Sequence, residues 1–212
     1  MTPVAITPCA HRVLDLAAAA ALAAALVIAP AAMPFSGATL IPAASATCPD
    51  AEVVFARGRQ EPPGVGAVGD ALVASLRSKV GVSVGVYGVN WPADIAVAPG
   101  ADDMRAHVQS MAASCPNTRL VLGGYSLGAT VADLATRSMP PGMNQHIAAV
   151  ALFGNGAKRL GPAPGFAGKT IDQCAEGDPI CGRGLNWPSH LQPSYLGSGL
   201  VEQAASFIAG KL

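Results

Sequence analysis

Residues 118–136 read T-R-L-V-L-G-G-Y-S-L-G-A-T-V-A-D-L-A-T, and the spacing of apolar residues changes within this stretch. The apolar run 119–123 is typical of a short buried strand, whereas from Leu127 onward apolar residues recur every three or four positions, as in a helix. Residues 124–128 join the two patterns and match G-x-S-x-G, the motif of a nucleophile elbow. The stretch therefore predicts a strand, a sharp turn at Ser126 and a helix.

The elbow makes Ser126 a candidate nucleophile. Glycines on both sides let the strand and the helix approach closely, which lifts the serine hydroxyl clear of the sheet edge. The first N–H groups of the helix would point at an oxyanion forming beside the serine and stabilise it. Because the chain has 24 glycines in 212 residues, the motif alone has a chance explanation. The strand before it and the helix after it favour the catalytic interpretation.

The composition indicates a folded chain without a nucleic-acid partner. Hydrophobic residues make up 51% of the sequence and charged residues 12%, which argues against disorder. The 13 basic and 13 acidic residues balance, and no basic cluster marks a surface for nucleic acid.

Residues 1–46 are predicted to be a secretory signal peptide. Arg12 supplies a positive charge, residues 16–29 form an unbroken apolar run, and Ala44-Ser45-Ala46 matches a small-residue cleavage site. A membrane anchor is the competing interpretation, because the segment around this run carries no charge. However, prolines interrupt the uncharged segment, and the apolar run 16–29 is short for crossing a bilayer. We expect export of a single catalytic domain, residues 47–212, to the medium or the cell surface.

The four cysteines of residues 47–212 indicate two disulfides. An even number in an exported chain is typical of paired cysteines, and four cysteines allow three pairings. The short spacing favours Cys174 with Cys181 as a local clip, which leaves Cys48 and Cys115 for each other. A zinc site is the alternative, but the sequence has no C-x-x-C pair and no nearby paired histidines. We therefore expect no metal.

Strand-like and helix-like segments alternate along residues 47–212. Strands are predicted at 52–56, 82–89, 119–123, 146–153 and 169–174, and helices at 65–80, 101–114, from 127 onward and at 199–211. Regular alternation predicts an α/β fold with a parallel sheet covered by helices on both faces. In such sheets the site lies beyond the carboxyl ends of the strands, where Ser126 falls.

A serine nucleophile needs a base to take its proton and an acid to orient that base. His190 lies in a loop after the last predicted strand, which is the usual place for the base. His107 falls in the middle of a predicted helix, and His146 falls at the wrong end of a strand. Asp178 precedes His190 in the same region and is the candidate acid, with Glu176 as its nearest rival. The order Ser, Asp, His is that of α/β-hydrolases.

These residues resemble the cutinase family, in particular its bacterial cutinase-like branch. The similarity covers essentially all of residues 47–212 and includes the position of His190. The matching stretches are C-P-D-A-E-V-V-F-A-R-G from Cys48, E-P-P-G-V-G from Glu61, G-Y-S-L-G-A-T from Gly124 and C-A-E-G-D-P-I-C from Cys174. The resemblance implies a small secreted serine esterase with an α/β-hydrolase-like, three-layer sandwich, a five-stranded parallel sheet and no lid over the serine.

The resemblance also assigns roles. It implies that Ser126 is the nucleophile, Asp178 the orienting acid and His190 the base, and both cysteine pairs match the family's disulfides. The expected substrate is a carboxylic ester with a short to medium acyl chain, lipid-like or cutin-like, and no cofactor is expected. We expect a monomer that contacts lipid interfaces. An apolar rim around His190 has four candidate residues, Leu185, Trp187, Pro188 and Leu191, for which packing within the loop is the alternative.

Two positions depart from the family's pattern, and both belong to the expected oxyanion hole. The family usually has Ser or Thr where this chain has Arg59, so a hydroxyl is lost and only the backbone N–H remains. The residue after the nucleophile is often Gln in the family and is Leu127 here. Losing one oxyanion donor costs about 3 kcal/mol of transition-state stabilisation, so activity is expected to be lower.

Other functions remain open from the sequence. A phospholipase or a cell-envelope acyltransferase would use the same three residues. A surface lipid-binding protein with a relic triad is an alternative of another class, suggested by Arg59 alone. A peptidase is disfavoured because the sequence shows no evident cleft for a peptide.

Overall fold

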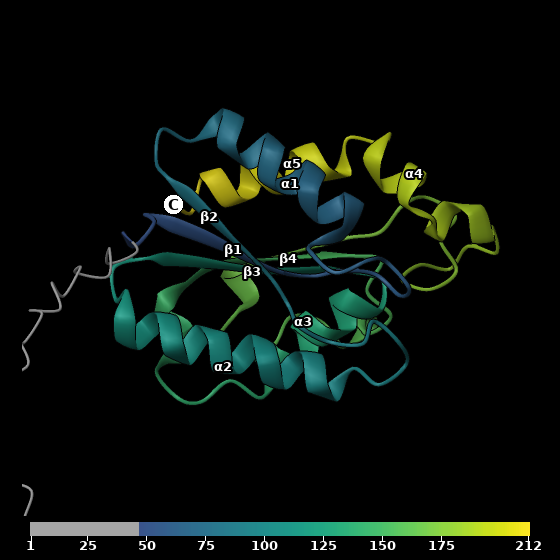
Figure 1. Cartoon of the computed structure of the whole chain (residues 1–212). Helices are drawn as coiled ribbons and strands as arrows, with labels where there is room; N and C mark the ends of the chain where they lie inside the picture. The colour runs from purple at the N-terminus through teal and green to yellow at the C-terminus, as the bar shows by residue number, and fades with distance from the viewer. Residues whose placement is uncertain (1–46) are drawn as a thin grey trace, which may run out of the picture. The chain divides into compact units, whose positions relative to one another are not determined.

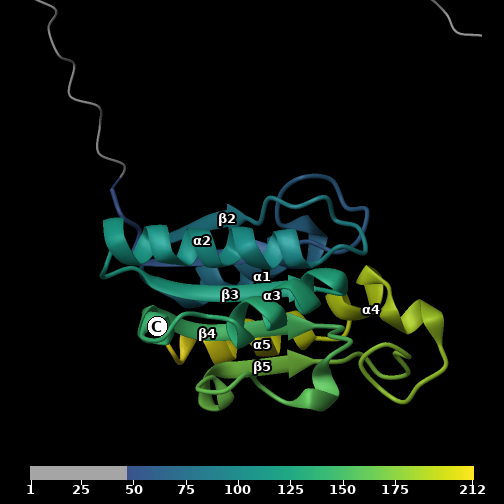
Figure 2. The same cartoon turned by 90° about the horizontal axis from the view of Figure 1, so that it is seen from below.

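The structure, a computed structural model, describes residues 47–212, so the predicted signal peptide lies outside the described residues. These residues form a parallel five-stranded sheet with the order β2-β1-β3-β4-β5 (Figures 1 and 2). The strands are β1 (Ala51–Ala56), β2 (Val84–Gly88), β3 (Arg119–Tyr125), β4 (Ile147–Phe153) and β5 (Thr170–Gln173). The predicted α/β fold with a five-stranded parallel sheet is confirmed.

Helices cover both faces of this sheet. The helices are α1 (Gly66–Lys79), α2 (Ala98–Ser114), α3 (Leu127–Arg137), α4 (Gln192–Leu196) and α5 (Leu200–Ala209), and the 3-10 turns are η1 (Met143–His146), η2 (Lys158–Leu160), η3 (Ala167–Lys169) and η4 (Trp187–His190). Helices α1 and α5 lie together on one face, and α2 and α3 lie on the other (Figure 1). Among the described residues, no helix is long and apolar enough to cross a membrane.

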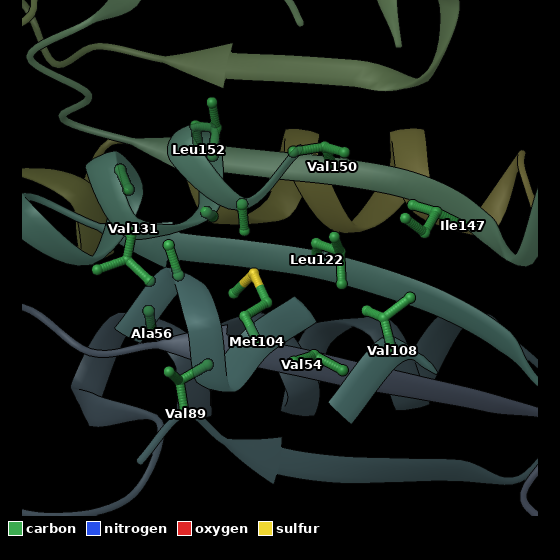
Figure 3. Packing of buried hydrophobic residues seen from close by; sticks show 14 of the residues in the cluster. Val54, Ala56, Val89, Met104, Val108, Leu122, Val131, Ile147, Val150 and Leu152 are labelled. Atoms are coloured by element: carbon green, nitrogen blue, oxygen red, sulfur yellow. The ribbon is translucent and has the colours of Figure 1, made fainter. Parts of the chain in front are cut away.

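Side chains alternate along the central strands and build one core on each face. In β1, Val53 and Phe55 pack toward α1 and α5, whereas Val54 and Ala56 pack toward α2 and α3. Figure 3 shows the second core, in which Met104 of α2 lies among the side chains of the sheet. Because both faces are covered, the central strands are apolar throughout, which is why their sequences read as unbroken apolar runs.

The predicted segments all appear, with small differences at their ends. Helix α2 begins at Ala98 rather than at 101, because Pro99 lies in its first turn, where a missing N–H costs nothing. Helix α4 was not predicted, since it has five residues and only Tyr195 is buried in it. A segment of this length shows no periodicity that separates it from a loop.

Both predicted disulfides are present. Cys48–Cys115 ties the start of β1 to the end of α2, with the Cα atoms 5.6 Å apart. Cys174–Cys181 closes a short loop directly after β5, with the Cα atoms 5.7 Å apart. Because it follows β5, the second bond lies at the carboxyl edge of the sheet. At this edge the strands point toward α4 (Figure 2).

Candidate active site

The elbow has the geometry that its glycines predict. Ser126 has φ 56° and ψ −122°, a conformation that costs energy for any residue with a side chain. A Cβ atom at Gly124 would lie 2.0 Å from the Gly128 carbonyl oxygen, and one at Gly128 would lie 2.0 Å from the Ala56 carbonyl oxygen. Only glycine fits at both positions, because α3 starts directly against the ends of β3 and β1.

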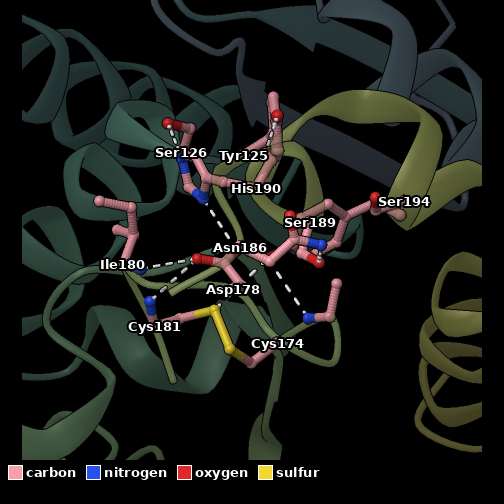
Figure 4. Close-up of polar contacts among 12 residues, drawn as sticks. Tyr125, Ser126, Cys174, Asp178, Ile180, Cys181, Asn186, Ser189, His190 and Ser194 are labelled. Atoms are coloured by element: carbon pink, nitrogen blue, oxygen red, sulfur yellow. Dashed lines mark hydrogen bonds and ion pairs between the residues drawn. A yellow bond between two sulfur atoms is a disulfide. The ribbon is translucent and has the colours of Figure 1, made fainter. Parts of the chain in front are cut away.

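Ser126, His190 and Asp178 form a continuous hydrogen-bonded chain (Figure 4). Ser126 Oγ lies 2.8 Å from His190 Nε2, and His190 Nδ1 lies 2.8 Å from Asp178 Oδ2. Ser126 follows β3, Asp178 follows β5, and His190 ends η4. The structure therefore brings together the three residues that the sequence singled out as nucleophile, base and acid.

Asp178 is completely buried, and its carboxylate is held by several donors. The N–H of Ile180 donates to Oδ1 at 2.7 Å and the N–H of Cys181 donates at 3.4 Å, while the Tyr195 hydroxyl joins His190 at Oδ2. Burial by itself raises the pKa of this carboxyl group, but the hydrogen bonds from Tyr195 and His190 outweigh it and hold the pKa below its usual range. Asp178 is therefore ionised at neutral pH.

The other candidates lie outside this chain. Glu176 is exposed to solvent. His107, on α2, lies with Nε2 2.8 Å from Glu52 Oε2, and its ring stacks on Tyr87 with a centroid distance of 3.6 Å. His146 ends η1 immediately before β4, at the opposite edge of the sheet.

Two buried tyrosines support the site and were missed in the sequence. The Tyr125 hydroxyl donates to the His190 carbonyl oxygen at 2.5 Å, and the Tyr195 hydroxyl donates to Asp178. Burial raises the pKa of both phenols above their usual range, and nearby carboxylates raise it further, chiefly Glu61 at Tyr125 and Asp178 at Tyr195, so both stay protonated donors. Tyr125 is the variable residue before the elbow serine, and no local pattern marks either tyrosine as part of a site.

The loop after β1 that carries Arg59 is held firmly. The buried Arg57 guanidinium donates to the carbonyl oxygens of Val89 and Trp91 at 3.3 and 2.8 Å, and its Nε donates to the Glu61 carbonyl oxygen at 2.8 Å. Within residues 47–212, the N–H groups of Arg59 and Leu127 donate to no protein acceptor. These are the two donors that the sequence assigns to an oxyanion hole.

A cavity of about 700 Å³ opens at Ser126 and His190. Apolar side chains line much of it, and they are Ile95, Leu127, Ile180, Trp187, Leu191 and Pro193. Of the four expected rim residues, Trp187 and Leu191 line the cavity, whereas Leu185 and Pro188 do not, although Leu185 is 97% exposed. The space beside the nucleophile is suited to an apolar chain.

Cys174, Cys181 and Asp178 also lie close enough together to suggest a metal site. The two sulfur atoms are joined in a disulfide, and the carboxylate is occupied by its hydrogen-bond donors. A thiolate ligand is therefore lacking in this group.

Comparisons with known proteins agree with the fold. The family model described as Cutinase matches residues 47–212. "Probable carboxylesterase Culp2" of Mycobacterium tuberculosis is 52% identical, covering 95% of this chain and 97% of that protein. "Phospholipase Culp4" of the same organism is 48% identical, covering 96% and 93%.

Two solved structures are similar to this chain as well. A Trichoderma reesei cutinase in complex with a phosphonate inhibitor superposes with a TM-score of 0.69 at 34% identity, covering 77% of this chain and 76% of that one. The catalytic core of an acetyl xylan esterase from Trichoderma reesei has a TM-score of 0.68 at 22% identity, covering 78% and 100%, and shows the fold alone. The chain belongs to the cutinase family.

Proposed function

We propose that this protein is an exported serine esterase in which Ser126, His190 and Asp178 act as nucleophile, base and orienting acid. The observation that carries the proposal is the hydrogen-bonded chain from Ser126 Oγ through His190 to a buried carboxylate, opening into an apolar cavity. Family membership and the carboxylesterase relatives make the chain a carboxylic ester hydrolase.

The proposed reaction proceeds through an acyl-enzyme. His190 Nε2 takes the hydroxyl proton of Ser126 while Oγ attacks the ester carbonyl carbon, and Asp178 stabilises the imidazolium that forms. The tetrahedral intermediate collapses as the alcohol oxygen takes the proton from His190 and leaves, so Ser126 is acylated. Water, deprotonated by His190, then attacks the acyl carbon and releases the carboxylic acid.

Two backbone donors would hold the oxyanion. Leu127 is the first residue of α3, so its N–H points out of the helix with the positive end of the helix dipole. Arg59 supplies the second N–H from the loop that Arg57 and Glu61 hold in place. Neither N–H has an acceptor among residues 47–212, so both are available to the substrate.

The apolar cavity supports an ester with a short to medium acyl chain, lipid-like or cutin-like. The exposed Trp187 and Leu191 beside His190 would contact a lipid surface. The two disulfides fit an exported protein, and we propose that residues 1–46 direct export and are removed.

A series of nitrophenyl esters from acetate to palmitate, measured on residues 47–212, tests the proposal. We expect turnover that depends on acyl length and that Ser126→Ala abolishes. A serine-reactive phosphonate should form one adduct, on Ser126. Absence of both turnover and adduct would leave a lipid-binding protein.

A phospholipase activity on the same triad is a second candidate, because one relative at 48% identity is named Phospholipase Culp4. Release of fatty acid from short-chain phosphatidylcholine, absent in Ser126→Ala, would demonstrate it. Transfer of the acyl group to a sugar hydroxyl in place of water would instead indicate an acyltransferase.

A further inference from the structure

Arg59 has an exposed side chain at the mouth of the active-site cavity. Apart from Arg59 and Arg183, each arginine in residues 47–212 donates a hydrogen bond to the protein. Arg59 lines the cavity together with Ser126 and His190, and among the described residues it is the one lining residue with a fixed charge. Among residues 47–212, the loop therefore presents to the nucleophile's cavity a guanidinium that has no hydrogen-bond partner in the protein.

The loop backbone around Arg59 is held by hydrogen bonds that do not use its guanidinium. Gln60, the next residue, has a left-handed φ of 62° and donates its N–H to the carbonyl oxygen of Ala93, whose φ is 56°. The Glu61 carboxylate accepts hydrogen bonds from the N–H of Gly58 at 2.6 Å, from the N–H of Ala67 at 3.0 Å and from the Gln192 side chain at 2.5 Å. The nearest carboxylate on the loop is thus bonded to other donors.

The distribution of charge decides on which side of Arg59 an anion would bind. A second cavity of about 670 Å³ shares Arg59, Gln60 and Gln192 with the first, and it is also lined by the carboxylates of Glu61 and Asp70. Within the part of the chain that the structure describes, the active-site cavity has no carboxylate in its lining. An anion would be repelled from the second cavity and attracted to the first.

We propose that the Arg59 side chain selects esters that carry an anionic group, a phosphate or a carboxylate, on the alcohol side of the scissile bond. This inference rests on the proposed function of the site. The apolar wall at Ile95, Ile180 and Trp187 takes the acyl chain, which leaves the guanidinium for the alcohol. Because the Arg59 N–H is also a proposed oxyanion donor, the anion would bind about one arginine side chain from the ester carbonyl.

Two matched pairs of hexanoyl esters test the proposal, both used below their micelle concentrations. The phosphate pair is hexanoylglycerol 3-phosphate and hexanoylglycerol. The carboxylate pair is 4-(hexanoyloxy)butanoate and butyl hexanoate. Wild type, Arg59→Gln, Arg59→Lys and Arg183→Gln are compared by kcat/KM from hexanoate release. Arg183 is the matched control because it is exposed, lacks a hydrogen bond among the described residues and lines neither cavity.

The measured quantity is the ratio of kcat/KM for the anionic ester to that for its neutral partner. Arg59→Gln should lower this ratio about tenfold, the typical effect of one charge-assisted hydrogen bond, and Arg59→Lys should retain most of it. Arg183→Gln should leave the ratio unchanged. Added salt should lower the ratio in wild type but not in Arg59→Gln, because the remaining interaction carries no charge.

The outcomes separate this inference from the proposed function. If wild type hydrolyses the neutral esters through Ser126 but Arg59→Gln keeps the same ratio for both pairs, the inference is wrong and the esterase function stands. If neither neutral ester is hydrolysed, the proposed function fails first. A change in one pair alone identifies phosphate or carboxylate as the group that Arg59 recognises.

Discussion

The hydroxyl of Tyr195 donates to Oδ2 of Asp178, the same carboxylate oxygen that accepts the hydrogen bond from His190. Tyr195 is completely buried and packs edge-on against Tyr125 and Phe153, with centroid distances of 5.4 and 6.4 Å. Packing in the core thus fixes the Tyr195 side chain, and its hydroxyl in turn fixes the Asp178 carboxylate. Through this hydrogen bond, the alignment of the catalytic residues depends on the packing of the core.

Tyr195→Phe should reduce both activity and stability. We expect the free energy of unfolding to fall by about 1–2 kcal/mol, because a buried carboxylate oxygen loses a donor, and kcat to fall several-fold. Because the pKa of Asp178 is lowered in the folded state, its ionised carboxylate stabilises that state at pH values above the usual carboxyl pKa. This contribution is lost as the pH falls through the lowered pKa. Without Tyr195 that pKa rises, so acid unfolding should move to higher pH.

Tyr125→Phe is the matched control for this shift. It also removes one buried phenol hydroxyl, but that hydroxyl donates to the His190 carbonyl oxygen and not to Asp178. Its acid unfolding should stay at the wild-type pH. If both variants shift equally, Tyr195 has no specific effect on the carboxylate.

Substitutions in the triad should not be additive. Ser126→Ala and His190→Ala should each abolish nearly all turnover, and the double variant should be little worse, because the residues act as a unit. Asp178→Asn should lower kcat on the order of 10³–10⁴-fold, as replacement of the triad aspartate by asparagine does in other enzymes. Glu176→Gln, which changes an exposed carboxylate nearby, is the control. If Asp178→Asn left kcat unchanged and Glu176→Gln lowered it strongly, Glu176 would be the orienting acid instead.

Arg59→Thr should raise kcat on neutral esters, whereas it should weaken the preference for anionic esters. A threonine hydroxyl would add a donor to the oxyanion hole, so kcat for nitrophenyl butyrate should rise, by at most about 100-fold, the usual worth of one such donor. Steady-state kinetics on purified variants measures this. An unchanged or lower kcat would mean that the arginine side chain already contributes to turnover of neutral esters.

Gly128→Ala should prevent correct formation of the elbow. The new Cβ atom would lie 2.0 Å from the Ala56 carbonyl oxygen and 2.3 Å from that of Arg57, so α3 must move away from β1. We expect a loss of about 3 kcal/mol in the free energy of unfolding, the upper end of the usual cost of overpacking. Gly81→Ala is the control, because nothing lies within 4 Å of its added Cβ. Denaturant unfolding of both variants gives the comparison, and equal stabilities would contradict the steric argument.

The two disulfides should fail differently when removed. By loop entropy, the ring closed by Cys174–Cys181 stabilises by about 2.5 kcal/mol and the ring closed by Cys48–Cys115 by about 4.4 kcal/mol. Cys48→Ser with Cys115→Ser should therefore lower the melting temperature more. Asp178 lies inside the smaller ring, so Cys174→Ser with Cys181→Ser should lower kcat more.

Melting temperature and kcat are measured side by side on both double variants. Full kcat without the Cys174–Cys181 bond would leave that bond with a structural role alone.

Local sequence pattern was sufficient for the order of strands and helices and for the elbow. Apolar period and glycine position are set by contacts within a few residues, so the change of spacing at Ser126 predicts a strand, a turn and a helix without knowledge of the rest of the chain. The same holds for the Cys174–Cys181 clip, since its partners are seven positions apart. Helix α4 was missed because five residues carry too little periodicity.

Contacts between segments distant in the sequence decided the supporting contacts of the site. Tyr195 meets Asp178 because α4 folds back over the loop after β5, and the Arg59 loop is held by Arg57 through carbonyl oxygens that follow β2. That Arg59 has no hydrogen-bond partner among residues 47–212 is likewise a property of the folded surface. A residue's neighbours in the sequence set its backbone preference, but its hydrogen-bond partners and solvent exposure depend on which segments the sheet order β2-β1-β3-β4-β5 brings together.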